Sequence, residues 1–172
     1  GGMSAKHPPQ PDWAPGLTIA HLPLPHLTAR NIQAAVLDVD RTLLPGRHVQ
    51  LPDSVRIWLE DAKRRMHLHL FSNNPSRARI AAVAEQLDLS FTSGAGKPRR
   101  GALRRVIQDF DLPPEQIAIV GDRLLTDVLV GNRLGLYTVL VRPVRDDGNA
   151  CSNETVPRLE KAFARLMGAP GA

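Results

Sequence analysis

The chain is poor in cysteine and in aromatic residues, and it lacks any long hydrophobic run. Its one cysteine, Cys151, excludes an internal disulfide and fits a reducing compartment. Two Trp, one Tyr and four Phe are few for the stacking platforms that bind single-stranded nucleic acid, so the sequence disfavours nucleic acid as a partner. No apolar stretch approaches the roughly 20 residues of a membrane-spanning helix, and no signal peptide is visible. We therefore expect a cytoplasmic protein.

The length of 172 residues suffices for one domain with a sizeable core. We expect residues 1–16 to be a flexible, proline-rich leader whose first two glycines are a cloning remnant. Residues 17–168 should form a single domain, followed by a tail at 169–172. The net charge of +5 fits an anionic partner, either a phosphorylated substrate or an acidic membrane surface, but it also fits ordinary solubility. The sequence leaves the oligomeric state open.

Short apolar runs alternate along the chain with segments of helical spacing. The predicted strands are 34–38, 68–71, 89–92, 117–120 and 137–141. Helices are predicted to begin near Asp53 as an N-cap, Ser76, Pro98 and Leu124, with a C-terminal amphipathic helix over Val156, Leu159, Phe163 and Leu166. This alternation predicts an α/β fold: a mainly parallel sheet in a three-layer, Rossmann-like arrangement, with helices on both faces.

Two aspartates, Asp38 and Asp40, follow the apolar run 34–37. Two carboxylates one residue apart at the end of a buried strand repel each other, and a divalent cation would offset that repulsion. In an open α/β sheet the carboxyl ends of the strands are also where ligands bind. This short segment therefore predicts a metal-containing site at one edge of the sheet.

Polar residues follow three further strands and should meet Asp38 and Asp40 at the same edge. These segments are Ser72-Asn73-Asn74, Gly96-Lys97-Pro98 and Gly121-Asp122 with Asp127. Carboxylates, one lysine, one hydroxyl and turn amides together suit phosphoryl transfer through an aspartate nucleophile, with Mg²⁺ offsetting the charge. Each residue alone has a simpler explanation: Asp122 could cap a helix, Ser72 could form a turn, and Lys97 could be solvated.

The four segments, in this order, resemble the haloacid dehalogenase (HAD) superfamily of phosphatases. The stretch 121–135 resembles more closely its subfamily IIIA, the YqeG-type branch, which is related to phosphatidylglycerophosphate phosphatases. Phe71-Ser72-Asn73-Asn74, Lys97-Pro98 and 139–144 fit the same branch, so the resemblance covers about residues 17–144. It implies a Mg²⁺-dependent phosphomonoester hydrolase that forms an aspartyl phosphate.

The resemblance also implies roles for the acidic residues and the lysine. Asp38 would be the nucleophile and a Mg²⁺ ligand, and Asp40 the general acid and base, with its backbone carbonyl on the metal. Lys97 would bridge Asp38 and the phosphate. Asp122 would complete the metal site, and Asp127 would be an outer-shell ligand or would position Lys97.

Four further residues are implied on the substrate side. Ser72 would bind the phosphate with Asn73 beside it, and Thr42 would support the substrate-binding loop. Arg41 stands where this branch usually carries Asn, so it could contact the substrate or point to solvent.

The spacing of the motifs leaves no room for a large cap domain, as in the C0 type of this superfamily. An open site favours a large or exposed phosphate, and phosphatidylglycerophosphate at the inner face of an anionic membrane fits both the openness and the charge. The alternative is a non-catalytic protein of the same fold, with a regulatory role or in association with nucleic acid or the ribosome.

Overall fold

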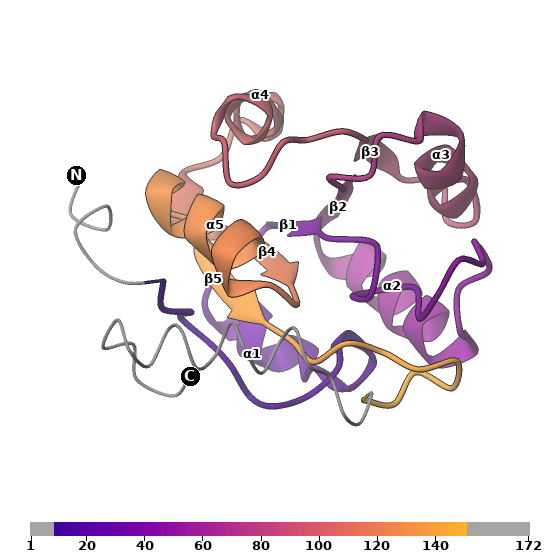
Figure 1. The fold of residues 1–172 in the computed structure, drawn as a ribbon. Helices are drawn as coiled ribbons and strands as arrows, with labels where there is room; N and C mark the ends of the chain where they lie inside the picture. The colour runs from indigo at the N-terminus through magenta and orange to yellow at the C-terminus, as the bar shows by residue number, and fades with distance from the viewer. Residues whose placement is uncertain (1–8, 151–172) are drawn as a thin grey trace.

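Five parallel strands form one sheet in the order β3-β2-β1-β4-β5 (Figure 1). The computed structural model describes residues 9–150, and the predicted C-terminal helix lies outside them. The strands are β1 (Ala34–Leu37), β2 (His67–Phe71), β3 (Ser90–Thr92), β4 (Ile117–Gly121) and β5 (Tyr137–Leu140). All five coincide closely with the predicted runs, and the predicted α/β fold with a parallel sheet is confirmed.

Helices cover both faces of the sheet (Figure 1). The α-helices are α1 (Leu24–Ala29), α2 (Asp53–Arg65), α3 (Arg77–Glu85), α4 (Gly101–Phe110) and α5 (Leu129–Leu134). Shorter turns are η2 (Ile19–His21), η3 (Pro114–Gln116) and the π-helical η4 (Leu124–Val128). Apolar residues of α1, α2 and α3 pack in one cluster, and those of α4 and α5 pack in another on the opposite face.

The two clusters take alternate residues of β1. Ala35 and Leu37 contribute to the cluster of α1, α2 and α3, whereas Ala34 and Val36 contribute to that of α4 and α5. Successive side chains of a strand point to opposite faces, so a strand covered on both faces must be apolar throughout. The continuous apolar run thus becomes the central strand, and Asp38 follows at the carboxyl edge of the sheet.

The helix starts differ in detail from the prediction. Asp53 is the first residue of α2 and forms no side-chain cap, because Pro52 takes the N-cap position. Ser76 caps α3 as predicted and accepts a hydrogen bond from the Arg79 amide. The helix predicted from Pro98 begins only at Gly101, and the segment predicted as one helix from Leu124 opens with a π-helical turn.

The N-terminal segment lies along the edge of β5 from Asp12 onward. The amides of Asp12 and Trp13 donate to the Thr138 carbonyl at 2.9 and 3.0 Å, and Trp13 forms a parallel bridge with Val139. Residues 12 and 13, expected in a flexible leader, are therefore bound to the sheet. This contact covers an otherwise open edge strand, whose unpaired backbone groups would invite pairing with another chain.

Short connections leave the carboxyl edge of the sheet uncovered. A loop and one helix, α2, join β1 to β2, and α3 alone lies between β2 and β3. The prediction that no large cap domain is inserted is confirmed. Within residues 9–150, no helix combines the length and the apolar character needed to cross a membrane.

Candidate active site

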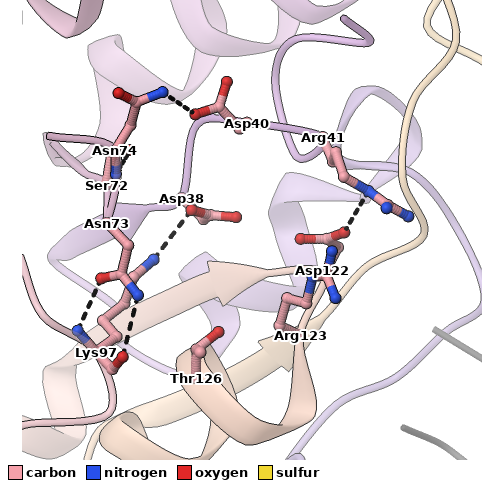
Figure 2. A pocket seen from close by; sticks show the side chains of 10 residues that line it. All are labelled: Asp38, Asp40, Arg41, Ser72, Asn73, Asn74, Lys97, Asp122, Arg123 and Thr126. Carbon is pink, nitrogen blue, oxygen red and sulfur yellow. Dashed lines mark hydrogen bonds and ion pairs between the residues drawn. The ribbon is translucent and has the colours of Figure 1, made fainter. Parts of the chain in front are cut away.

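A pocket of about 280 Å³ opens at the carboxyl ends of the parallel strands (Figure 2). The residues that line it are Asp38, Asp40, Arg41, Ser72, Asn73, Asn74, Lys97, Asp122, Arg123 and Thr126. They come from the four segments that the sequence places at this edge, which therefore do meet. Two of the expected site residues, Thr42 and Asp127, lie behind the pocket wall.

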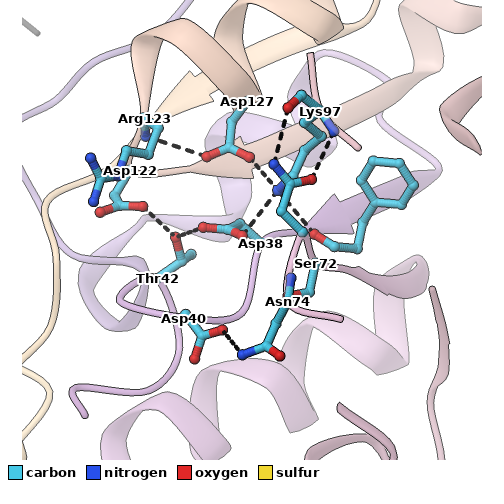
Figure 3. A network of polar contacts seen from close by, with 11 residues as sticks. Asp38, Asp40, Thr42, Ser72, Asn74, Lys97, Asp122, Arg123 and Asp127 are labelled. Carbon is cyan, nitrogen blue, oxygen red and sulfur yellow. Dashed lines mark hydrogen bonds and ion pairs between the residues drawn. The ribbon is translucent and has the colours of Figure 1, made fainter. Parts of the chain in front are cut away.

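Lys97 is buried between two carboxylates beneath the pocket (Figure 3). Its Nζ donates to Asp38 Oδ1 at 3.0 Å, to Asp127 Oδ1 at 2.6 Å and to the Phe71 carbonyl at 3.1 Å. Burial alone would lower the pKa of Lys97, but the charges of Asp127 and Asp38 outweigh it and raise the pKa above its ordinary value. The lysine is therefore a fixed positive charge beside Asp38.

Gly121 makes room for Asp127 at the end of β4. A Cβ at position 121 would lie 2.1 Å from the Cγ of Asp127, so no other residue fits there without moving that carboxylate. The second oxygen of Asp127 accepts a hydrogen bond from the Arg123 amide at 3.3 Å. One oxygen of Asp127 thus holds the Lys97 ammonium and the other is held by the backbone, so Asp127 positions the lysine.

Asp38, Asp122 and Asp127 each offer an oxygen within 4.8 Å of the others. Asp122 is buried, and its Oδ2 accepts no hydrogen bond within residues 9–150, although the Arg41 Nε lies 3.3 Å away. Clustered carboxylate oxygens, one of which (Asp122 Oδ2) accepts no hydrogen bond among the described residues, suit a hard cation such as Mg²⁺. Asp38 and Asp122 therefore fit a divalent metal. The Asp40 side chain is not part of this cluster, which leaves only its backbone carbonyl for the metal.

The buried acidic cluster predicts an unusual dependence of stability on pH. Burial, and then the charges of Asp38 and Asp127, raise the pKa of Asp122 from 3.8 to about 8. Between these values the folded chain holds a proton that the unfolded chain has released. The free energy of unfolding should therefore fall as pH rises, and this one carboxyl group contributes at most about 1.4 kcal/mol per pH unit. Urea unfolding without divalent cations, at several pH values across this window, measures the slope.

Mg²⁺ should oppose this loss because it binds the carboxylates only where folding brings them together. Added Mg²⁺ is expected to raise the urea midpoint more at the alkaline end of the window than at the acidic end. An equal Mg²⁺ effect at both ends would contradict binding at the acidic cluster.

Asp40 points away from the acidic cluster and toward Asn74 (Figures 2 and 3). Its Oδ1 accepts from the Arg79 Nη2 at 2.7 Å and from the Nε at 3.1 Å, while its Oδ2 accepts from the Asn74 Nδ2 at 3.2 Å. The Asp40 side chain is about one-third exposed, so it can still be reached from the pocket. This geometry suits contact with a substrate better than metal ligation.

The residues expected on the substrate side divide into two groups. Ser72 lines the pocket, and its Oγ accepts from the Asn74 amide at 3.0 Å, which leaves its hydroxyl proton for a ligand. Arg41 also lines the pocket and pairs with Asp122. Thr42 is fully buried and donates to Asp38 Oδ2 at 3.0 Å, so it supports the Asp38 carboxylate and does not line the pocket.

Asn73 lines the pocket, but its amide is engaged by the backbone of Lys97. Its Oδ1 accepts from the Lys97 amide at 2.7 Å, and its Nδ2 donates to the Lys97 carbonyl at 3.0 Å. This two-point contact fixes the loop that carries the lysine. The structure thus gives Asn73 a positioning contact where the sequence suggested a substrate contact.

Asn74 and Gly121 lie in the segments that the sequence places at the site, but the sequence analysis gave neither of them a role, and it did not name Arg79. Arg79 lies in the first turn of α3, directly after the polar segment that follows β2. A helix that starts at the carboxyl edge of the sheet brings its first turn to the site, so this position was a usable signal. The role of Gly121 depends on the course of the π-helical turn, for which the sequence carried no signal.

Comparisons with known proteins agree with this arrangement. Residues 94–152 match a family of HAD-hydrolase-like proteins. The chain is 35% identical over 150 residues to the "Probable phosphatase YqeG" of Bacillus subtilis. The aligned region covers 87% of this chain and 84% of that protein. It is 30% identical over 162 residues to the chloroplastic phosphatidylglycerophosphate phosphatase 1 of Chlamydomonas reinhardtii, covering 84% of this chain but only 60% of that protein.

A solved structure supports the fold. The HAD-like hydrolase SP0104 of Streptococcus pneumoniae superposes with a TM-score of 0.55 over 81% of this chain and 92% of its own, at 13% identity. The identity and coverage shared with the Bacillus protein, together with the fold and the family match, lead to one conclusion: this chain belongs to the HAD-like hydrolases, in the YqeG phosphatase branch.

Proposed function

We propose that the protein is a Mg²⁺-dependent phosphomonoester hydrolase that forms an acyl phosphate on Asp38. The observation that carries this proposal is the buried Lys97, held 3.0 Å from Asp38 at the base of an open pocket. A purely structural ion pair would have no need of a second, partly exposed carboxylate, Asp40, two residues away at the pocket wall. A nucleophile, a fixed cation and a separate acid–base group are the minimum for this chemistry.

The first step is attack by a carboxylate oxygen of Asp38 on the phosphorus of the bound monoester. The bond from phosphorus to the leaving oxygen breaks, and the leaving alkoxide takes a proton from Asp40. Lys97 stabilises the charge on the transferring group, and the Ser72 hydroxyl donates to one of its oxygens.

The second step regenerates the enzyme. Asp40, now a carboxylate, takes a proton from water as the water oxygen attacks phosphorus. The bond to Asp38 breaks, and inorganic phosphate leaves. Thr42 keeps the Asp38 carboxylate in place throughout, since its hydroxyl donates to Oδ2.

The side chains of Asp38 and Asp122, with the backbone carbonyl of Asp40, would hold Mg²⁺. When bound, the ion supplies positive charge where an anionic phosphate must approach an anionic carboxylate. Asp127 would act on this site through Lys97.

The open pocket supports a substrate whose phosphate is presented on a large or exposed group. The chain resembles a phosphatidylglycerophosphate phosphatase over most of its length, and its net charge of +5 favours an anionic surface. We therefore propose the headgroup of phosphatidylglycerophosphate as substrate. The protein would then act in the cytoplasm, in peripheral contact with the inner face of the membrane.

The test is phosphate release from p-nitrophenyl phosphate and from phosphatidylglycerophosphate in detergent, each with Mg²⁺ or with EDTA. We expect release that requires Mg²⁺ and is faster from the lipid. Release from p-nitrophenyl phosphate alone would support the hydrolase and overturn the lipid substrate. Absence of release from both compounds, with Mg²⁺ binding confirmed by calorimetry, would favour a non-catalytic protein.

A further inference from the structure

Arg79 joins three parts of the molecule at the rim of the pocket. From the first turn of α3, it directs Nε and Nη2 at Asp40 Oδ1, at 3.1 and 2.7 Å. Its Nη2 also donates to the Gly46 carbonyl at 2.8 Å, and its Nη1 donates to the Arg47 carbonyl. The side chain is only 16% exposed, so the guanidinium is packed in place and does not sample solvent freely.

The loop that Arg79 holds follows directly after the nucleophile segment. Gln86, the C-cap residue of α3, donates from Nε2 to the Val49 carbonyl and accepts from the Leu51 amide through Oε1. The loop over residues 46–51 is thereby tied to α3 at two places. Of the two residues that hold the loop, Arg79 and Gln86, Arg79 also binds a carboxylate of the pocket, that of Asp40.

We propose that Arg79 is a positioning residue, which acts through Asp40 by fixing that carboxylate at the pocket wall where a leaving oxygen must receive its proton. The inference rests on the proposed hydrolase function. A planar guanidinium with several donors in fixed directions suits this task, because it can hold a carboxylate and two backbone carbonyls at once. Without Arg79, Asp40 would keep only the hydrogen bond from Asn74 among the contacts described above.

The inference predicts a selective defect. Proton donation matters most when the leaving group is strongly basic and least when it departs as a stable anion. Phenyl phosphate and p-nitrophenyl phosphate differ in this respect while presenting similar rings and the same phosphate. Loss of the Asp40 position should therefore slow the first step, which expels the leaving group, much more with phenyl phosphate than with p-nitrophenyl phosphate.

The experiment compares wild type, Arg79→Ala and Arg79→Lys on these two substrates with Mg²⁺. We expect Arg79→Ala to lower kcat/KM, which reports only the step that expels the leaving group, by about 10- to 100-fold for phenyl phosphate and by no more than about 3-fold for p-nitrophenyl phosphate. Arg79→Lys should recover part of the loss. Arg77→Ala is the matched control, because Arg77 lies on the same helix but stacks on Phe91, away from the pocket, at 4.8 Å from its ring centre.

A second comparison separates action through Asp40 from direct contact with the substrate. In an Asp40→Asn background, Arg79→Ala should change kcat/KM for phenyl phosphate little, because the group it positions is already disabled. A full additional loss there, or an equal loss of kcat/KM on both substrates when Asp40 is present, would overturn the inference. Wild type inactive on both of these substrates and on phosphatidylglycerophosphate would instead overturn the proposed function. Thermal unfolding of each variant checks that the kinetic differences arise in folded protein.

Discussion

Replacement of Asp38 by Asn should lower the rate of phosphate release by about a thousand-fold or more, while the protein remains folded. Asn has nearly the same shape as Asp and can still accept the hydrogen bond from Thr42 that Asp38 Oδ2 accepts at 3.0 Å. It cannot form an acyl phosphate in the way that a carboxylate does. The loss should therefore appear in kcat, since the pocket wall that binds the phosphate is unchanged.

The measurement is kcat for p-nitrophenyl phosphate at saturating Mg²⁺, together with the thermal unfolding midpoint. Asp61→Asn is a suitable control, because Asp61 lies on α2 and pairs with Arg64 and Arg65 at the surface. That variant should keep its activity. Substantial turnover by Asp38→Asn would show that Asp38 is not the nucleophile.

Replacement of Lys97 by Met should damage stability as well as activity. The substitution leaves Asp38 and Asp127 close together and buried without their shared cation. Removal of one partner of a buried ion pair commonly costs about 3–5 kcal/mol, because an uncompensated charge remains. Activity should also fall steeply, since no positive charge would then face the transferring phosphate.

Urea unfolding of Lys97→Met and of the double variant Lys97→Met with Asp127→Asn tests this explanation. The double variant should be more stable than Lys97→Met alone, because it removes the Asp127 charge, one of the two buried charges left without a cation. Lys63→Met serves as the control, since Lys63 donates to the Leu87 carbonyl at the exposed end of α2. If Lys97→Met destabilises the protein no more than Lys63→Met does, the charge of Lys97 is not needed to stabilise the buried carboxylates.

The sheet and the position of the site could be predicted because they depend on local patterns. An apolar run such as 117–120 marks a strand that is buried on both faces, and polar residues after such runs must meet where parallel strands end. Asp38, Lys97 and Asp122 are found together for this reason. The same reasoning placed Ser72 in the pocket.

The contacts that could not be predicted depend on how distant segments pack. Arg79 and Asp40 are 39 positions apart, and their pairing depends on how the loop at residues 46–51 folds back onto α3. Asn73 is polar and next to the site, so sequence alone could not show that its amide binds the Lys97 backbone. Similarly, the proline-rich composition near the N-terminus did not reveal that Trp13 pairs with the edge of β5.

The central claim, that Asp38 carries the phosphoryl group, is tested most directly by trapping the intermediate. The enzyme is quenched during turnover of p-nitrophenyl phosphate and treated with borohydride, which reduces an aspartyl phosphate to homoserine, and the modified residue is located by peptide mass spectrometry. We predict homoserine at position 38, only when substrate and Mg²⁺ are both present. Reduction at another aspartate, or no reduction in samples that release phosphate in the same mixture, would contradict the assignment of Asp38.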